Sequence, residues 1–135
     1  MKLKKNIFLI LNIIIPLVAG LGIYVFMKNT TYINDFLGLS FNYVPKTFIG
    51  TFIVNWFCDF LWSYAFVFTL YLVLEPFSKR IIISPIITVI VGTALELMQK
   101  SGTLTGTFDW WDIAVELVAV LVAVAVLKVR KTSES

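Results

Sequence analysis

Acidic side chains are crowded into one short part of a chain that is otherwise apolar. Asp109 lies in the stretch Gly-Thr-Phe-Asp-Trp-Trp, and Glu96, Asp112 and Glu116 lie on either side of it. Carboxylates held together in apolar surroundings can bind a hard cation through their oxygen atoms, share a proton, or act as an acid and base pair. Which of these the residues can do depends on the segments that carry them.

The composition indicates a lipid bilayer as the surroundings of this chain. Of its 135 residues, 59% are apolar and 14% are charged, whereas soluble domains are usually about 45–50% apolar. Apolar segments of roughly 20 residues can cross a hydrocarbon core of about 30 Å, and helices satisfy their own backbone groups there. We predict an all-α polytopic membrane protein whose single domain, 1–135, is a four-transmembrane-helix bundle. The expected spans are 7–27, 55–74 (with an alternative start near Phe48), 81–98 and 111–127.

Basic residues predict the orientation of this bundle. Most of the eleven lysines and arginines flank the segments on one side, and short cytoplasmic flanks carry an excess of such residues. Both termini are therefore expected in the cytoplasm. The net charge of +3 is explained by this topology and by anionic headgroups, so we expect no nucleic-acid partner. The residues on the cytoplasmic side are Lys2, Lys4, Lys5, Lys79, Arg80, Lys128, Arg130 and Lys131.

This orientation brings polar groups from three predicted helices to the outer membrane face. They are Asp59 near the outer end of the second segment, Glu96 and Gln99 at the outer end of the third, and Asp112 and Glu116 at the outer start of the fourth. Helical steps of three or four residues place Gly92, Glu96 and Gln99 on one stripe and Asp112 and Glu116 on another. We expect the two stripes to face each other, and Gly92 to permit a close helix crossing at the level of the carboxylates.

Some of these acids have a purely structural interpretation. Asp109 precedes a helix whose free N–H groups it can cap, Asp112 could do the same, and Gly106 belongs to the turn before them. Glu116 lies more than one turn inside its segment, and Glu96 lies at a helix C-terminus, where the helix dipole disfavours negative charge. A carboxylate at membrane depth costs about 2–4 kcal/mol, so both are functional candidates. Structural hydrogen bonding is the alternative for each.

The closing part of the chain resembles VanZ-like membrane proteins. Glu96-Leu-Met-Gln99 is followed by a short loop and by Gly106-Thr-Phe-Asp109-Trp-Trp-Asp112 at the start of a final helix. Asp59 resembles the aspartate that this family carries in its second helix, and the four-helix plan is similar. The resemblance implies a protein of the bacterial cytoplasmic membrane, in a family associated with low-level teicoplanin resistance. It also implies a role at the cell envelope, on an amphipathic or lipid-linked molecule or a partner protein.

The chain departs from the pattern of that family. VanZ-like proteins commonly follow the second-helix aspartate with Lys and later His, whereas Phe60 and Ser63 stand here and the chain contains no His. The loop from Gly102 to Thr107 also lacks the Arg that is often present. The carboxylates are therefore less balanced, and a bound cation or a shared proton becomes more necessary.

Two other functions stay open beside the envelope role. One is a small proton- or cation-coupled carrier, or an accessory subunit of a membrane complex, in which Glu96, Asp112 and Glu116 bind the ion. Four helices would then need a homo-oligomer or a membrane partner to enclose a path. The other is an intramembrane enzyme, which the sequence supports least because no His and no nucleophile beside a base is present. We expect no cofactor, and the sequence leaves open whether the carboxylates bind a proton, a metal ion or only each other.

Overall fold

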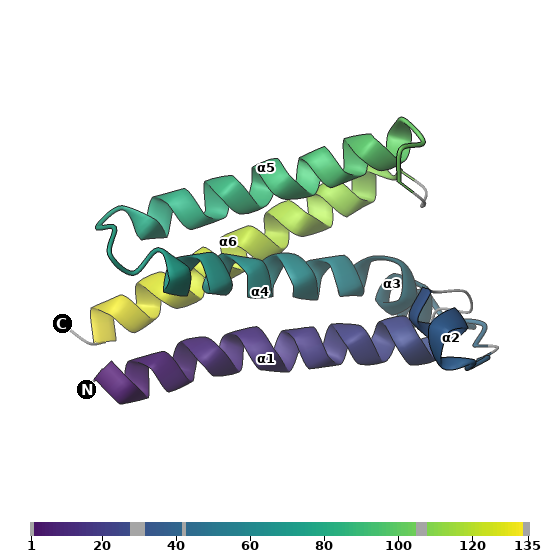
Figure 1. Cartoon of the computed structure of the whole chain (residues 1–135), viewed down its shortest axis with the longest axis horizontal. Helices are drawn as coiled ribbons and strands as arrows, with labels where there is room; N and C mark the ends of the chain where they lie inside the picture. The colour runs from purple at the N-terminus through teal and green to yellow at the C-terminus, as the bar shows by residue number, and fades with distance from the viewer. Residues whose placement is uncertain (1, 28–31, 42, 105–107, 134–135) are drawn as a thin grey trace.

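The chain forms a bundle of long helices that lie side by side (Figure 1). This computed structural model describes residues 2–27, 32–41, 43–104 and 108–133. The expected all-α fold is confirmed, because the described residues contain helices and no strand. The helices are α1 (Lys2–Met27), α2 (Tyr32–Leu37), α3 (Phe48–Phe52), the π-helical segment η1 (Ile53–Phe57), α4 (Cys58–Val73), α5 (Arg80–Lys100) and α6 (Trp110–Ser133).

Three of the described helical stretches are long and apolar enough, by length and composition, to cross a membrane. They are Asn6–Met27, Phe48–Val73 and Arg80–Lys100. The second starts near Phe48, the alternative start considered above. These stretches support a multi-pass membrane protein. α6 is a fourth long helix, of 24 residues, but it is not among them, so the fourth crossing stays a prediction.

The second span is not one regular α-helix. α3 begins after Thr47, whose Oγ1 accepts a hydrogen bond from the Gly50 N–H at 3.1 Å. The π-helical turn Ile53–Phe57 then joins α3 to α4 without a break in the helix. Such wide turns inside helices often occur at functional sites. Asp59, in the first turn of α4, follows this one directly.

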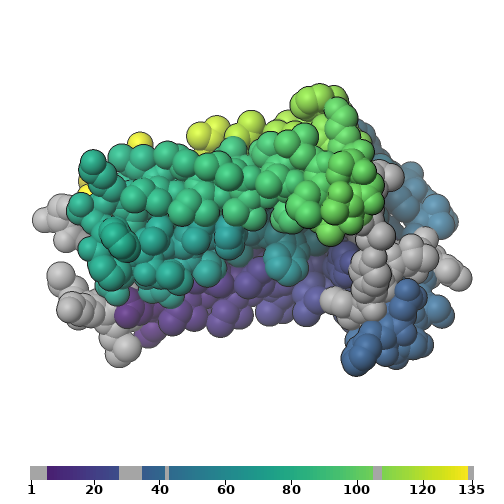
Figure 2. Space-filling model, turned by 45° about the horizontal axis from the view of Figure 1, so that its top comes forward, coloured from purple at the N-terminus to yellow at the C-terminus, as the bar shows by residue number. Residues whose placement is uncertain are grey.

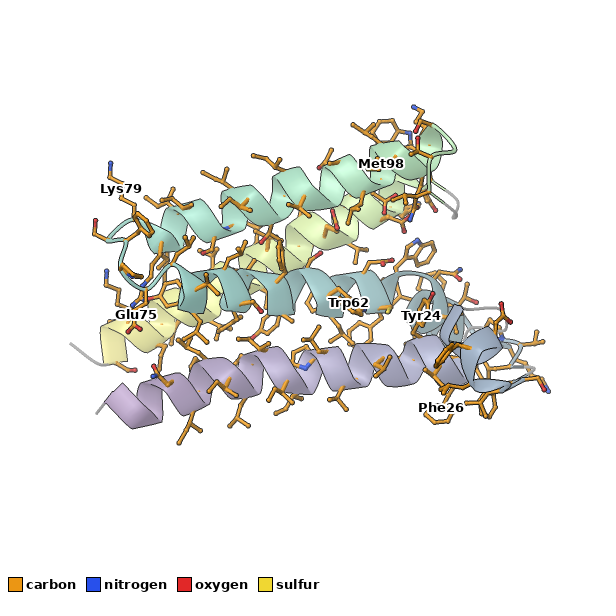
Figure 3. The ribbon with its side chains drawn as sticks, in the orientation of Figure 1. Tyr24, Phe26, Trp62, Glu75, Lys79 and Met98 are labelled. Atoms are coloured by element: carbon orange, nitrogen blue, oxygen red, sulfur yellow. The ribbon has the colours of Figure 1, made fainter. Side chains whose placement is uncertain are left out.

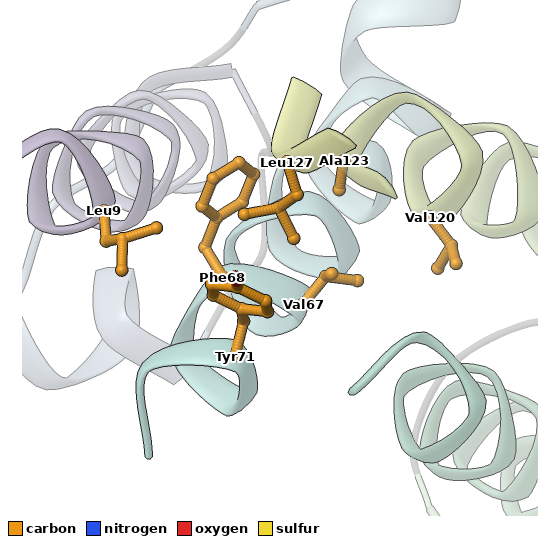
Figure 4. Packing of buried hydrophobic residues seen from close by; sticks show 7 residues of the cluster. All are labelled: Leu9, Val67, Phe68, Tyr71, Val120, Ala123 and Leu127. Carbon is orange, nitrogen blue, oxygen red and sulfur yellow. The ribbon is translucent and has the colours of Figure 1, made fainter. Parts of the chain in front are cut away.

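α4 is the central helix, because it packs against α1, α5 and α6. Phe68 and Val67 of α4 are fully buried, and Leu9 of α1 and Leu127 of α6 lie in the same apolar cluster (Figure 4). Polar groups join the same helices nearer the middle. The Tyr64 hydroxyl of α4 donates a 2.6 Å hydrogen bond to Asn12 Oδ1 of α1, a contact that helps helices associate in lipid.

The outer faces of the long helices carry apolar side chains. On α5, Ile82, Ile86 and Ile90 are exposed at steps of four residues, on the helix that Figure 2 turns toward the viewer. On α1, Ile15 and Val18 are exposed in the same way. Exposed apolar surface of this extent is rare on a soluble monomer, and a lipid bilayer would cover it.

The two ends of the bundle differ in the chain segments that they hold. α1 begins and α6 ends at the same end, together with the turn from α4 to α5 (Figure 1). Glu75 and Lys79 lie at this end, and Met98 lies at the other (Figure 3). We call the first the terminal end and the second the loop end.

Cysteine labelling tests the predicted orientation, with the terminal end in the cytoplasm. Cys58 is buried, and its Sγ donates to the Gly20 carbonyl at 3.5 Å, so Cys58→Ser keeps a donor and gives a cysteine-free background. Single cysteines then replace Lys100 at the loop end and Ser133 at the terminal end, both exposed. A membrane-impermeant maleimide should label position 100 in intact cells and position 133 only after permeabilisation. Labelling of both positions from one side would contradict the four-helix topology.

Candidate functional site

Four carboxylates from three helices gather toward the loop end of the bundle. They are Asp59 of α4, Glu96 of α5, and Asp112 and Glu116 of α6, and we call them the carboxylate cluster. Glu96 interacts electrostatically with Asp112, Asp59 and Glu116, and also with Asp109 just before α6. The structure therefore brings together the acids that the helical spacing placed on facing stripes.

Glu96 is the member of the cluster with a buried carboxylate oxygen that lacks a hydrogen bond from the described residues. It lies four residues before the end of α5, and its side chain is only 9% exposed. Its Oε2 is buried and accepts no hydrogen bond within the described part of the chain. A buried acceptor without a donor costs free energy, so this oxygen requires a proton or a donor from another molecule.

Glu116 has partners on two neighbouring helices. Ser63 of α4 donates a hydrogen bond to Glu116 Oε1 at 3.3 Å. The carboxylate also lies against Gly92 of α5, where an added Cβ atom would overlap it. The sequence predicted that Gly92 would permit a close helix crossing. In the structure, the group that uses the space over this glycine is the Glu116 carboxylate.

The start of α6 positions the remaining acids. Asp109 Oδ1 accepts a hydrogen bond from the Trp111 N–H at 3.1 Å, and its carbonyl accepts one from the Asp112 N–H at 3.1 Å. Asp109 is therefore the N-cap of α6. Asp112 is buried in the first turn, with 9% of its surface exposed. The cap fixes the helix start that carries this second buried acid.

Gln99, another predicted site residue, follows Glu96 on α5. Gln99 is half-buried one turn after Glu96 on α5, and its carbonyl accepts a hydrogen bond from the Gly102 N–H at 3.0 Å. Gly102 has a φ of 76°, in the region that favours glycine, and helps the chain turn away from α5. Gly106 lies outside the described residues.

The cation nearest in sequence to the cluster contacts aromatic rings. The Lys100 ammonium lies 5.0 Å from the centre of the Phe108 ring and 5.6 Å from that of the Trp110 ring, and such contacts stabilise a cation. Lys100 thus joins the end of α5 to the start of α6. In the sequence Lys100 directly follows Gln99, but nothing in the sequence pattern indicates these ring contacts.

The geometry of the carboxylate cluster favours binding of a proton or a ligand over coordination of a metal ion. Across the described residues, no group of three or more His, Cys, Asp or Glu side chains is placed so that it could hold a metal ion. Close carboxylates in apolar surroundings repel when all are ionised. A shared proton, or a ligand that brings hydrogen-bond donors and positive charge, relieves that repulsion without metal coordination.

Comparison with known proteins identifies no homologue of the chain. No protein-family model matches the chain, and neither the curated proteins nor the solved structures contain a match. The resemblance to VanZ-like proteins therefore rests on the short motifs around Asp59, Glu96 and Asp112. Any function has to be argued from the site itself.

A double-mutant cycle tests the contact between Gly92 and Glu116. Gly92→Ala should destabilise the bundle by about 1–3 kcal/mol, because the new methyl group forces the Glu116 carboxylate away from Ser63. In a Glu116→Ala background the same change should cost nothing, which gives a coupling of at least about 1 kcal/mol. The free energy of unfolding in detergent is the measurement.

Gly22→Ala is the matched control, because an added Cβ at Gly22 meets nothing within 4 Å. This helical glycine should gain up to about 1 kcal/mol from the higher helix propensity of alanine. Equal effects of the two alanines, or additive effects in the cycle, would mean that the Glu116 carboxylate does not depend on Gly92.

Proposed function

We propose that the chain is a bacterial membrane protein that acts at the cell envelope. In this proposal the loop end faces outward, and the carboxylate cluster binds the polar head of an amphipathic or lipid-linked molecule. The role is similar to that implied by the resemblance to VanZ-like proteins, including an influence on susceptibility to lipid-tailed glycopeptides such as teicoplanin. In this proposal the cluster acts by binding, and the chain contains no histidine that could serve as a base beside it.

The observation that carries this proposal is the buried, unsatisfied Oε2 of Glu96. A carboxylate with a purely structural role is expected to have both oxygens hydrogen-bonded by the protein. A buried oxygen without a hydrogen bond costs about 1–3 kcal/mol, and more if the group is charged. A hydroxyl-rich or ammonium-bearing head would supply the missing donor. The positive charge of an ammonium group would also reduce the repulsion between Glu96 and Asp112.

The surroundings of Glu96 favour an amphipathic ligand over a fully polar one. Leu95, Leu97 and Met98, its neighbours on α5, are exposed. An apolar tail could lie along these side chains and stay within the hydrocarbon layer while the head reaches the carboxylates.

A proton-coupled role is the second candidate, and the depth of Glu116 favours it. This acid lies inside α6, further from the helix start than Asp112, and its hydroxyl partner Ser63 belongs to another helix. Acids in such positions serve as proton relays in membrane carriers. A carrier of this kind, or an accessory subunit, would use the same cluster to hold a proton in place of a ligand head.

Complementation of a deletion strain tests the envelope role. Loss of the protein should change susceptibility to at least one member of a panel of lipoglycopeptides and other envelope stressors, and the wild-type chain should restore it. Glu96→Gln and Asp112→Asn should each fail to restore it, because a carboxamide cannot offer the negative charge that a cationic head requires. Minimal inhibitory concentrations and membrane levels of each variant are the measurements.

The control is Asp35→Asn, which removes an exposed acid of α2 at the same end of the bundle. This variant should complement like the wild type, and Asp109→Ser should be close to it because serine also caps a helix. An unchanged profile of the deletion strain across the whole panel would reject the envelope role. Proton uptake into proteoliposomes that is lost in Glu116→Gln would then favour the carrier.

A further inference from the structure

A cavity of about 280 Å³ opens at the terminal end, far from the carboxylate cluster. Side chains of α1, α4, α5, α6 and the turn from α4 to α5 line it. A single water needs only about 10–15 Å³ of such space, so the cavity has room for a much larger polar group. Nothing in the carboxylate chemistry described above involves this region.

Cations line the cavity, and aromatic rings hold two of them in place. The Arg80 guanidinium lies 4.2 Å from the centre of the Tyr71 ring, and its Nη1 donates to the Tyr71 carbonyl at 3.4 Å. The Arg130 guanidinium lies 5.0 Å from the centre of the Phe8 ring. Both arginines are half-buried, and Lys131 adds a third positive charge to the lining. Stacking reduces the freedom of both arginines and so favours binding of an anion by them.

The backbone adds to this positive potential. α5 begins at Arg80, beside the cavity, and its N-cap residue Lys79 makes no side-chain capping bond. The first turn of a helix of this length carries a partial positive charge that favours anions, although the N–H groups of Arg80 and Ile82 already donate to the carbonyls of Phe77 and Lys79. Glu75 is the one acid among the described lining residues, and it is exposed. The lining therefore has a net positive charge.

Part of the cavity lining is apolar. Leu9 and Leu127 are already packed in the apolar cluster of the bundle, whereas Phe77 is exposed and Ile81 is half-buried in the lining. A free phosphate ion would satisfy the cations but would leave Phe77 and Ile81 without an apolar partner. A phosphate attached to a glycerol backbone and acyl chains matches both the basic and the apolar parts of the lining.

We propose that this cavity binds the phosphate group of an anionic phospholipid from the adjacent leaflet. Arg80 and Arg130 hold the phosphate oxygens through charge-assisted hydrogen bonds, and Lys131 adds long-range attraction. Basic pockets at the ends of membrane helices are suited to such headgroups. The site is independent of the carboxylate cluster and of the function proposed for it.

Native mass spectrometry of the full chain in a non-ionic detergent tests this site. Short-chain phosphatidylglycerol should bind the wild-type protein at one site, roughly fivefold or more tightly than phosphatidylcholine of the same chain length. Arg80→Gln and Arg130→Gln should each weaken phosphatidylglycerol binding roughly tenfold, as expected for loss of a hydrogen bond to a charged group. Glycerol phosphate, a water-soluble compound with the same phosphate group, should bind far more weakly than the lipid.

Lys128→Gln is the matched control, because it removes one positive charge from the same end of α6 at an exposed position outside the lining. It should weaken binding by less than about threefold, as an exposed surface charge does. If an arginine variant loses its helix content or its monodispersity, the Arg→Lys change at the same position replaces it; it keeps the charge but loses the paired donors of the guanidinium, and it should still weaken binding more than Lys128→Gln does.

Three outcomes would overturn the proposal. An equal loss in Lys128→Gln would assign the binding to general surface charge. Equal affinity of the wild-type protein for phosphatidylcholine would exclude selection of an anionic lipid. Glycerol phosphate that binds as tightly as the lipid would assign the cavity to a soluble phosphate compound.

Discussion

The Glu116 carboxylate is the contact on which the packing of α4, α5 and α6 depends at the loop end. It accepts a hydrogen bond from Ser63 of α4 and lies over Gly92 of α5. In lipid, apolar side chains gain little by leaving the solvent, so close packing and polar contacts decide how helices associate. A larger residue at Gly92 would displace the carboxylate, and a residue without a hydroxyl at Ser63 would leave Oε1 without this donor. Ser63 on α4 and Gly92 on α5 thus both accommodate the same acid of α6.

A different kind of packing holds the terminal end. There Phe68 of α4 lies in an apolar cluster that Leu9 and Leu127 complete from α1 and α6. Tyr71 belongs to this cluster and also carries the Arg80 guanidinium over its ring, so the apolar core directly supports the basic cavity. The bundle therefore separates its charges by end, with carboxylates beyond the core on one side and stacked arginines on the other. Each set is positioned by its own part of the packing.

The sequence predicts the helices and their buried faces better than it predicts which residues of neighbouring helices contact those faces. Helical spacing placed Gly92 and Glu96 on one face of the third segment, and both are buried, because an otherwise apolar helix turns its few small and polar residues toward protein. Spacing cannot say which atom fills the space over Gly92, since that depends on how α6 lies against α5. The π-helical turn Ile53–Phe57 has no sequence signal of this kind. The basic cavity draws residues from four helices, so periodicity within any one helix could not reveal it.

Glu96 and Glu116 differ in how far the protein itself satisfies their carboxylate oxygens. Both are glutamates at similar cost to a membrane helix, and sequence patterns treat them alike. Glu116 has a hydroxyl donor on a neighbouring helix and a glycine that makes room for it, which is what a packing role requires. Glu96 has a buried oxygen that no donor in the described chain reaches, although substitution by an apolar residue would remove that cost. This oxygen therefore requires a proton or a donor that the described chain does not supply.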